Sequence, residues 1–269
     1  MKSIAIYGKG GIGKSSIASN IAAYLGKKGL KVAIIGCDPK SDSSLSLMHG
    51  TRIPTILDLL RQHRRISEED VVFEGVFGVK CVEVGGPEPG VGCAGRGIIV
   101  AIEYLRRISD ILDASDIVIY DVPGDIVCGG FATPIKEHLI DESYIVSSGE
   151  YLPLYAANNI CRGLKTLNAP LGGVICNARG VEREREILER FARRIGTKLV
   201  AFIPKDEIVQ RMERASLTVV EGAPESQMAK IYGELAERIL SNEDAKVPHP
   251  LSDSELRSIF NEREGSGKR

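Results

Sequence analysis

The stretch that decides the fold is Gly8-Lys9-Gly10-Gly11-Ile12-Gly13-Lys14-Ser15, which matches the pattern G-x-x-x-x-G-K-[ST] without a gap. It follows a short apolar run at 3–7 and precedes an amphipathic segment at 15–28. In such a loop the glycines let backbone N–H groups turn toward phosphate oxygens, Lys14 reaches the β- and γ-phosphates, and Ser15 ligates Mg²⁺. The helix that follows adds the positive end of its dipole. The sequence therefore predicts a nucleotide phosphate site that uses the whole stretch from Gly8 to Ser15.

Short apolar runs rich in β-branched residues alternate with amphipathic segments along the chain. The expected strands are residues 3–7, 32–37, 80–84, 116–121, 143–148, 172–177 and 199–203. The expected helices are residues 15–28, 55–62, 96–109, 151–166, 181–195 and 225–240. This alternation predicts an α/β fold, a doubly wound and mostly parallel sheet with helices on both faces. We expect one P-loop ATPase domain over 1–241 and a peripheral C-terminal arm over 242–269, with a short helix near 252–262 and a frayed end.

The composition excludes several classes of protein. The chain has 269 residues, and its 35 Lys and Arg nearly balance its 36 Asp and Glu, so a general nucleic-acid binder with a basic surface is not expected. Hydrophobic residues at 43% and charged residues at 26% are typical of a folded chain. No apolar run approaches the roughly 18 residues of a membrane span, and no signal-peptide pattern opens the chain. We therefore expect a cytoplasmic protein that binds neither nucleic acid nor a membrane.

A second lysine, Lys9, stands early in the phosphate loop. The pattern Lys-Gly-Gly-x-Gly-Lys-Ser resembles the deviant Walker A loop of dimeric ATPases, which include septum-site and plasmid-partition ATPases, arsenite-pump ATPases and nitrogenase iron proteins. The resemblance implies a homodimer in which Lys9 crosses the subunit boundary to the nucleotide of the partner. A solvated loop lysine is the alternative. All of these classes share one fold, so the fold alone does not choose among them.

Acidic residues follow two of the expected strands. Asp38 and Asp42 come after the second strand, and Asp121 and Asp125 come at the end of the fourth. Ligands of open parallel sheets bind at this carboxyl edge, so carboxylates there suit a nucleotide switch. Asp121 suits an outer-shell role on Mg²⁺, and the other three are candidates to orient the attacking water. An ordinary turn aspartate is the alternative for each of them.

Two of the six cysteines, Cys93 and Cys128, stand in glycine-rich turns ahead of expected helices. Backbone N–H groups in such turns can hydrogen-bond sulfide and thiolate, which tunes an iron–sulfur cluster. A cubane cluster needs four thiolates, and two per chain become four when two chains share one cluster on a symmetry axis. The other cysteines are expected to pack as small apolar groups; these are Cys37, Cys81, Cys161 and Cys176. The four histidines show no ligand spacing.

Several segments resemble the nitrogenase iron protein family almost word for word; they are residues 5–15, 36–42, 78–97, 121–131 and 155–160. The similarity runs from residue 1 to about residue 240. It implies that Cys93 and Cys128 ligate a [4Fe-4S] cluster that bridges a homodimer, with MgATP as the nucleotide. It also implies that Arg96 lies on the docking face, at a position that is ADP-ribosylated in some nitrogen fixers. The positions that match an adenine pocket are Asn177, Pro204 and Asp206.

The resemblance implies an ATP-hydrolysing oxidoreductase, an electron donor that serves a separate catalytic component and is itself reduced by a low-potential donor such as ferredoxin or flavodoxin. Two alternatives stay open. A nitrogenase-like reductase component would serve the reduction of a tetrapyrrole (a nickel-tetrapyrrole or chlorophyll precursor) or of a sulfur compound. A clusterless partition or positioning ATPase would carry no iron. The chain departs from the family pattern at Pro123, where leucine is usual, and this departure leaves the identity of the catalytic partner open.

Overall fold

An eight-stranded sheet lies at the centre of the computed structural model, which describes residues 1–62, 65–86, 94–124 and 139–261. Within these residues the strands run in the order β3-β4-β2-β5-β1-β6-β7-β8. Their bounds are β1 Lys2–Tyr7, β2 Val32–Gly36, β3 Phe73–Glu74, β4 Lys80–Glu83, β5 Ile117–Asp121, β6 Glu142–Ser147, β7 Leu171–Asn177 and β8 Leu199–Ile203. The described neighbours are parallel except for β3, which runs antiparallel to β4. The predicted α/β fold with a mostly parallel sheet is confirmed.

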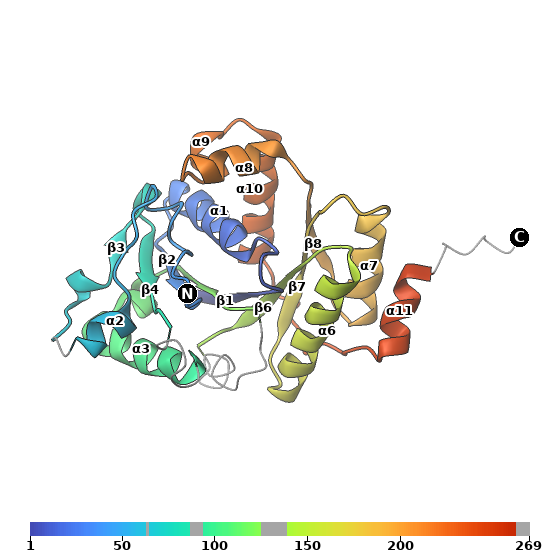
Figure 1. Ribbon diagram of the computed structural model, residues 1–269, viewed down its shortest axis with the longest axis horizontal. Coiled ribbons are helices and arrows are strands. Elements are labelled where there is room, and N and C mark those ends of the chain that lie inside the picture. The colour runs from blue at the N-terminus through green and yellow to red at the C-terminus, as the bar shows by residue number, and fades with distance from the viewer. Residues whose placement is uncertain (63–64, 87–93, 125–138, 262–269) are drawn as a thin grey trace, which may run out of the picture.

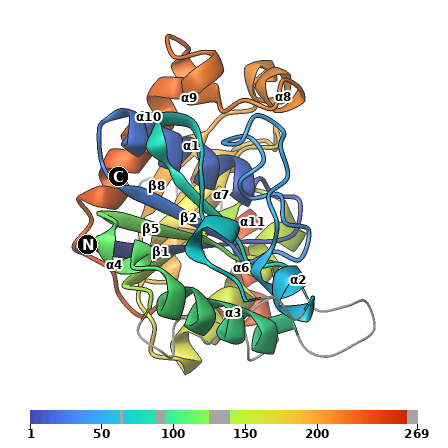
Figure 2. The ribbon, with the colours of Figure 1, turned by 90° about the vertical axis from the view of Figure 1, so that its left-hand side faces the viewer.

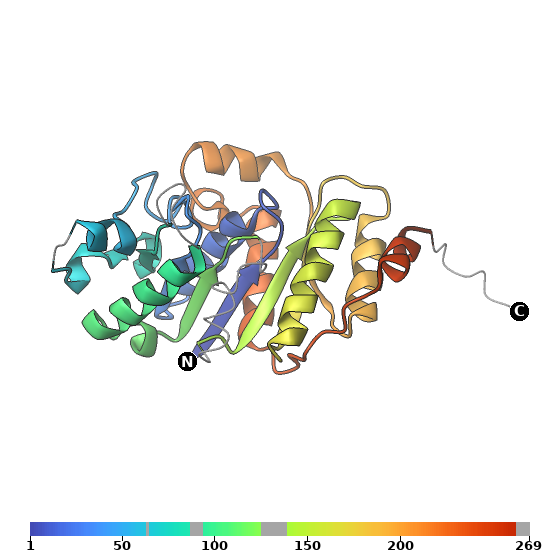
Figure 3. The same ribbon diagram turned by 60° about the horizontal axis from the view of Figure 1, so that its bottom comes forward.

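Helices cover both faces of this sheet (Figure 1). Their bounds are α1 Lys14–Lys27, α2 Ile56–Arg61, α3 Ala94–Ile108, α4 Ile111–Ala114, α6 Tyr151–Thr166, α7 Glu184–Arg194, α8 Glu207–Arg214, α9 Val219–Gly222, α10 Gln227–Leu240 and α11 Asp253–Asn261. Figure 2 shows α1 and α10 above the sheet and α3 and α6 below it. Figure 3 turns this second face forward and shows α3, α6 and α7 in succession across it. The sheet is therefore the middle layer of three.

The strands are apolar at nearly every position because both of their faces are buried. In β1, Ile4 and Ile6 pack in the core beneath α1 and α10, whereas Ala5 and Tyr7 pack in the core beneath α3 and α6. All four side chains are fully buried. A continuous apolar run of this kind gives no period-2 alternation, so the expected strands were identified by their length and their β-branched residues.

The expected elements are confirmed within a few residues at their ends, and several short ones were not predicted. The missed elements include β3, α4, α8 and α9. Each of these is too short for a helical or alternating pattern to stand out. The helix α8 begins at an N-cap, where the Asp206 carboxylate accepts from the Ile208 N–H at 2.9 Å. No helix in the described ranges is long and apolar enough to cross a membrane.

The segment after α10 returns to the body of the domain. Lys246 forms a β-bridge with Leu171 at the start of β7, and α11 packs against α7. Leu256 and Ile259 of α11 are fully buried. The expected short helix near 252–262 is thus confirmed as α11, and the division of the chain at residue 241 stays a prediction. Residues 262–269 lie outside the described ranges.

Asn158 of α6 holds this returning segment in place. Its side-chain amide donates to the Leu251 carbonyl at 2.8 Å and accepts from the Leu251 N–H at 2.8 Å. We expect Asn158→Leu to lower the free energy of unfolding by about 1–3 kcal/mol, because the buried Leu251 N–H loses its acceptor. Urea denaturation measures this change. The exposed Lys165 on the same helix serves as the control, since Lys165→Ala should stay within about 0.5 kcal/mol of the parent; equal stability of both variants would contradict the assignment.

Candidate functional site

The phosphate loop packs closely against the ends of β6 and β7. Gly8 and Gly13 have positive φ angles of 148° and 97°, and neither has room for a Cβ. At Gly8 a Cβ would collide with the Val146 carbonyl of β6, and at Gly13 it would collide with the side-chain nitrogen of Asn177. Glycine is therefore required at both positions by its conformation and by the close approach of β6 and Asn177.

Lys14 begins α1 and is only 7% exposed. Its Nζ lies 3.5 Å from the Lys9 carbonyl, so the ammonium is folded back toward the loop. Burial lowers the pKa of Lys14, while the charges of Asp121 and Asp38 raise it. A buried ammonium beside backbone N–H groups suits a phosphate oxygen. The next residue, Ser15, is half-buried and lines a small cavity of about 220 Å³ together with Asp42.

Asp121 ends β5 and is 1% exposed. Its Oδ2 accepts from the Ser43 hydroxyl at 2.7 Å, and its Oδ1 has no hydrogen-bond partner in the part of the chain that the structure describes. Burial raises the pKa of Asp121, whereas the nearby hydroxyls of Ser15 and Ser43 and the charge of Lys14 lower it. A buried carboxylate with an open oxygen needs a donor or a cation nearby. The residues present therefore fit a magnesium ion whose bound water reaches Asp121.

The two acids after β2 have different surroundings. The Asp38 carboxylate accepts from the Lys40 N–H at 3.0 Å, which closes a local turn, and Asp38 is half-buried. Asp42 is also half-buried and shares its cavity with Ser15. Both acids therefore lie at the carboxyl edge of the sheet, near the phosphate loop. Asp125, the fourth acidic candidate, lies outside the described residues.

A fully buried acid that the sequence analysis missed, Glu83, stands at the end of β4. Its Oε1 accepts from the Ser44 N–H at 2.8 Å and from the Ser44 hydroxyl at 2.6 Å. Burial raises the pKa of Glu83 to about 7, against the hydrogen bonds from Ser44, which lower it. The signal was an acidic residue between Val82 and Val84 inside an expected strand.

A second cavity, of about 210 Å³, opens beside the phosphate loop between β7 and α8. The Asn177 side chain donates to the Ile12 carbonyl at 2.8 Å, and the Arg179 guanidinium donates to the Gly11 carbonyl at 2.5 Å. The structure brings together the three residues expected at an adenine pocket, since the cavity is lined by Asn177, Pro204 and Asp206. It adds side chains that no motif indicated, namely Arg179, Gln210, Glu213 and Tyr232.

One buried carboxylate, that of Glu184, fixes the loop that carries Arg179. It accepts from the backbone N–H groups of Arg179, Gly180 and Val181 at 3.0–3.1 Å. It also accepts from the Gly149 N–H at 2.8 Å, just before α6. Because several charge-assisted hydrogen bonds converge on one side chain, the loop at the second cavity and the start of α6 are held together.

The cysteines divide into two groups. Cys37, Cys81, Cys161 and Cys176 are buried and free, which confirms their predicted packing. Burial raises the pKa of each of these thiols, so they stay protonated and are poor metal ligands. No cluster of three or more acids, histidines or cysteines suited to a metal occurs among the described residues.

The remaining candidates lie in segments that the structure does not describe. Cys93 immediately precedes α3, which begins at Ala94, and Cys128 follows the described residue Gly124 by four positions. Both thiols, and the side chain of Arg96, lie outside the described part of the chain. The assignment of Cys93 and Cys128 as ligands of an iron–sulfur cluster therefore stays a prediction.

A family model described as "4Fe-4S iron sulfur cluster binding proteins, NifH/frxC family" matches residues 2–265. The chain belongs to this family. Nitrogenase iron protein 2 of Methanobacterium ivanovii is 55% identical over 259 residues, which cover 96% of this chain and 98% of that protein. Nitrogenase iron protein 2 of Methanothermobacter thermautotrophicus is 52% identical over 97% of both chains. The expected family is confirmed.

The fold is shared more widely than the family. The cell division ATPase MinD of Pyrococcus furiosus matches with a TM-score of 0.68 and 22% identity, over 88% of this chain and 98% of that one. MinD in the MinC:MinD cell division protein complex of Aquifex aeolicus matches with a TM-score of 0.70 and 20% identity, over 94% and 99% of the two chains. Similarity at this level shows the fold alone.

The contrast between the two loop lysines gives a test of the phosphate site. We expect Lys14→Ala to weaken MgADP binding by about 10- to 100-fold, because a charge-assisted hydrogen bond to phosphate is lost. Lys9 is exposed, and Lys9→Ala should change MgADP affinity by less than about threefold. Isothermal titration calorimetry measures both affinities. An equal loss in the two variants would contradict the division of roles between the lysines.

Proposed function

We propose that this chain is an ATP-dependent electron donor of the nitrogenase iron protein type. It is an ATP-hydrolysing oxidoreductase that passes electrons from a [4Fe-4S] cluster to a separate catalytic component. The observation that carries the proposal is the match to an iron–sulfur family over residues 2–265, with relatives named nitrogenase iron proteins at about half identity or more. The fold would equally suit a clusterless positioning ATPase, and the family match favours the iron–sulfur protein.

The cluster belongs to a homodimer. Cys93 and Cys128 from each of two chains supply the four thiolates that a cubane cluster needs. When bound, the cluster stores and releases a single electron. The support for this ligand set is that the other thiols of the chain are buried and protonated.

MgATP hydrolysis at the nucleotide site supplies the free energy for electron transfer. Lys14 binds the β- and γ-phosphate oxygens, Ser15 ligates Mg²⁺, and the open oxygen of Asp121 accepts from a water on that ion. Asp38, Asp42 and Asp125 orient the attacking water. The base occupies the cavity lined by Asn177, Pro204 and Asp206. The burial and the hydrogen bonds described above support these assignments except that of Asp125, which rests on the sequence alone.

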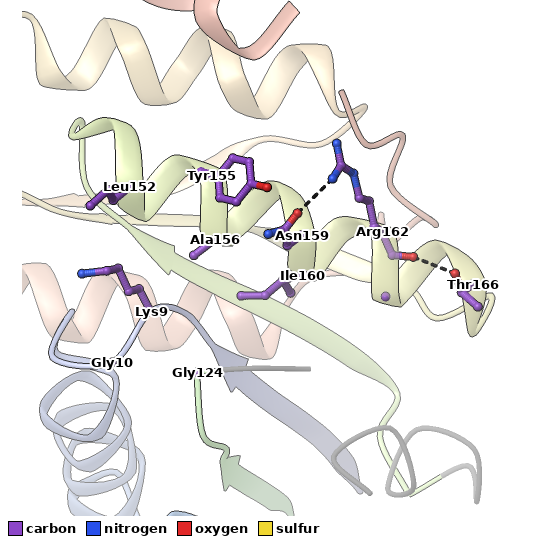
Figure 4. Close-up of a pocket in the computed structure, with 11 residues that line it drawn as sticks. Lys9, Gly10, Gly124, Leu152, Tyr155, Ala156, Asn159, Ile160, Arg162 and Thr166 are labelled. Carbon is purple, nitrogen blue, oxygen red and sulfur yellow. Dashed lines mark hydrogen bonds between the residues drawn. The ribbon is translucent and has the colours of Figure 1, made fainter. Parts of the chain in front are cut away.

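A second copy of the chain would cover a further cavity, of about 580 Å³, between the phosphate loop and α6. Figure 4 shows Lys9 and Gly10 on one side of this cavity and Leu152 and Tyr155 of α6 on the other. Leu152 is 61% exposed, and Lys9 is exposed at the opposite wall. An exposed leucine beside a loop lysine suits a subunit boundary. Across that boundary Lys9 reaches the nucleotide of the partner.

The chain between Asp121 and Cys128 links the nucleotide to the cluster. A Cβ on Gly124 would lie 2.7 Å from the Gly8 carbonyl oxygen and 2.8 Å from the Gly10 nitrogen. This segment therefore touches the phosphate loop directly and reaches Cys128 four residues later. A contact with the γ-phosphate at this point is transmitted along one continuous piece of chain.

The partners outside the dimer follow from the same proposal. The catalytic component docks near Arg96, and a low-potential donor such as ferredoxin or flavodoxin reduces the cluster in the cytoplasm. The relatives named nitrogenase iron proteins favour a catalytic component of the nitrogenase type.

The ligand set predicts the iron content of cysteine variants. We expect Cys93→Ser and Cys128→Ser to purify with little or no iron, because each removes two of the four thiolates of the dimer. The buried Cys161 is the matched control, and Cys161→Ser should keep the iron of the parent. Iron analysis and the visible absorption of the thiolate-ligated cluster measure the result. Full iron content after the loss of Cys93 would overturn the bridging assignment.

The link through residues 121–128 predicts that MgATP alters access to the cluster. We expect MgATP to raise the rate at which an iron chelator removes the cluster, and MgADP to raise it less. Pro123 fixes its own φ and lacks an N–H, so Pro123→Leu should change this rate while iron content stays the same. Stopped-flow absorbance of the iron–chelator complex measures the rate. Chelation that is indifferent to MgATP in both proteins would contradict nucleotide control of the cluster.

A further inference from the structure

Three neighbouring strands end in one row at the carboxyl edge of the sheet. Gly36 of β2 is in register with Glu83 of β4 on one side and with Asp121 of β5 on the other. The space that a Cβ of Gly36 would take is filled by the Glu83 carboxylate. The row therefore brings two buried acids to the place where the chain leaves β2 for the loop that carries Asp38 and Asp42.

These two acids hold consecutive residues of that loop. Asp121 accepts from the hydroxyl of Ser43, and Glu83 accepts from both the N–H and the hydroxyl of Ser44. Both serines are buried, with exposures of 0% and 2%. The loop is thus fixed one residue after Asp42 by two different strands, and the stronger attachment, with two hydrogen bonds, is to Glu83.

The strand end that holds the loop also leads toward Cys93. From Glu83 the chain continues through Gly85 and Gly86, and a Cβ on Gly86 would lie 2.5 Å from the Pro39 side chain. Pro39 follows Asp38 directly. The loop after β2 and the segment after β4 therefore meet twice, at Ser44 with Glu83 and at Pro39 with Gly86.

Packing alone does not account for the acid in this position. One oxygen of Glu83, Oε2, is buried without a hydrogen-bond partner among the described residues. A buried carboxyl with an open oxygen costs free energy that an apolar side chain of similar size would not. Glu83 accepts two hydrogen bonds from Ser44, and these contacts fix the loop.

We propose that Glu83 is a positioning residue that ties the loop Asp38–Ser44 to the strand end leading to Cys93. Movement of this loop in response to the nucleotide then reaches the cluster segment by a second route, separate from the segment 121–128. The inference rests on the proposed function, because it assigns the loop to MgATP and Cys93 to the cluster.

Limited proteolysis tests whether Glu83 fixes the loop, and it requires neither iron nor ATP hydrolysis. Trypsin can cut after Lys40, which is exposed in the loop. We expect cleavage at Lys40 to be at least about fivefold faster in Glu83→Ala, because the loss of hydrogen bonds to a charged acceptor favours local opening. Glu83→Gln, which keeps an acceptor for Ser44, should restore most of the protection. The control is Glu74→Ala, since the exposed Glu74 carboxylate of β3 pairs with Lys80 of β4 and not with the loop.

Ser44→Ala tests the same contact from the loop side and serves if Glu83→Ala does not fold. It should speed cleavage at Lys40 by a smaller factor, about threefold, because the Ser44 N–H bond is retained. Cleavage at the parent rate in both Glu83→Ala and Ser44→Ala would overturn the proposal.

The second measurement is the ratio of the chelation rates with and without MgATP. We expect this ratio to fall at least about threefold in Glu83→Ala, with iron content and MgADP affinity unchanged. An equal loss of MgADP affinity would mean that Glu83 only maintains the fold, and it would overturn the positioning role. If the parent itself shows no effect of MgATP on chelation, the proposed function fails, while cleavage at Lys40 still decides whether Glu83 holds the loop.

Discussion

The burial of two carboxylates on either side of Gly36 is the constraint on which the nucleotide site depends. Burial raises the pKa of both carboxyls, and the charge of Asp121 raises that of Glu83 further. Lys14 is the buried cation that lowers the pKa of Asp121. The hydroxyls of Ser43 and Ser44 satisfy one oxygen of each acid. The remaining oxygens, Asp121 Oδ1 and Glu83 Oε2, have no partner in the described chain. Burial thus disfavours the charged form of both acids at the edge where Mg²⁺ would enter, and a cation there would favour it.

Hydrogen bonds between side chains and the backbone connect the remaining parts of the site. The phosphate loop is held by Asn177 and Arg179, whose side chains donate to the carbonyls of Ile12 and Gly11. Glu184 in turn fixes the loop of Arg179 and the start of α6. The cavity lined by Asn177, the phosphate loop and the start of α6 are therefore connected by hydrogen bonds to buried or backbone groups, so a shift at one of them strains the others.

Local patterns in the sequence were enough for the sheet, the phosphate loop and the family. Strands such as β1 are apolar throughout because both faces are covered, and the loop between β1 and α1 is one contiguous motif. Glu83 could not be found this way, because its partner Ser44 is 39 residues away in the chain and only the sheet order brings them together. Gln210 and Glu213 belong to α8, a helix of two turns that was not predicted from the sequence. The roles of Cys93, Cys128, Asp125 and Arg96 stay predictions, since they lie outside the described residues or have undescribed side chains.

The fold and the family answer different questions about this chain. At 20–22% identity the MinD structures share its sheet and its helices, and a shared architecture does not specify what each protein does. The predicted cluster ligands of this family lie where the chain leaves the carboxyl edge of the sheet, after β4 and after β5, in the two segments that carry Cys93 and Cys128. Both segments begin at a buried acid of the same row, Glu83 and Asp121. In the proposed function, a change of charge at the nucleotide would act at the base of both cluster segments at once, which is what a switch that couples ATP to a shared cluster requires.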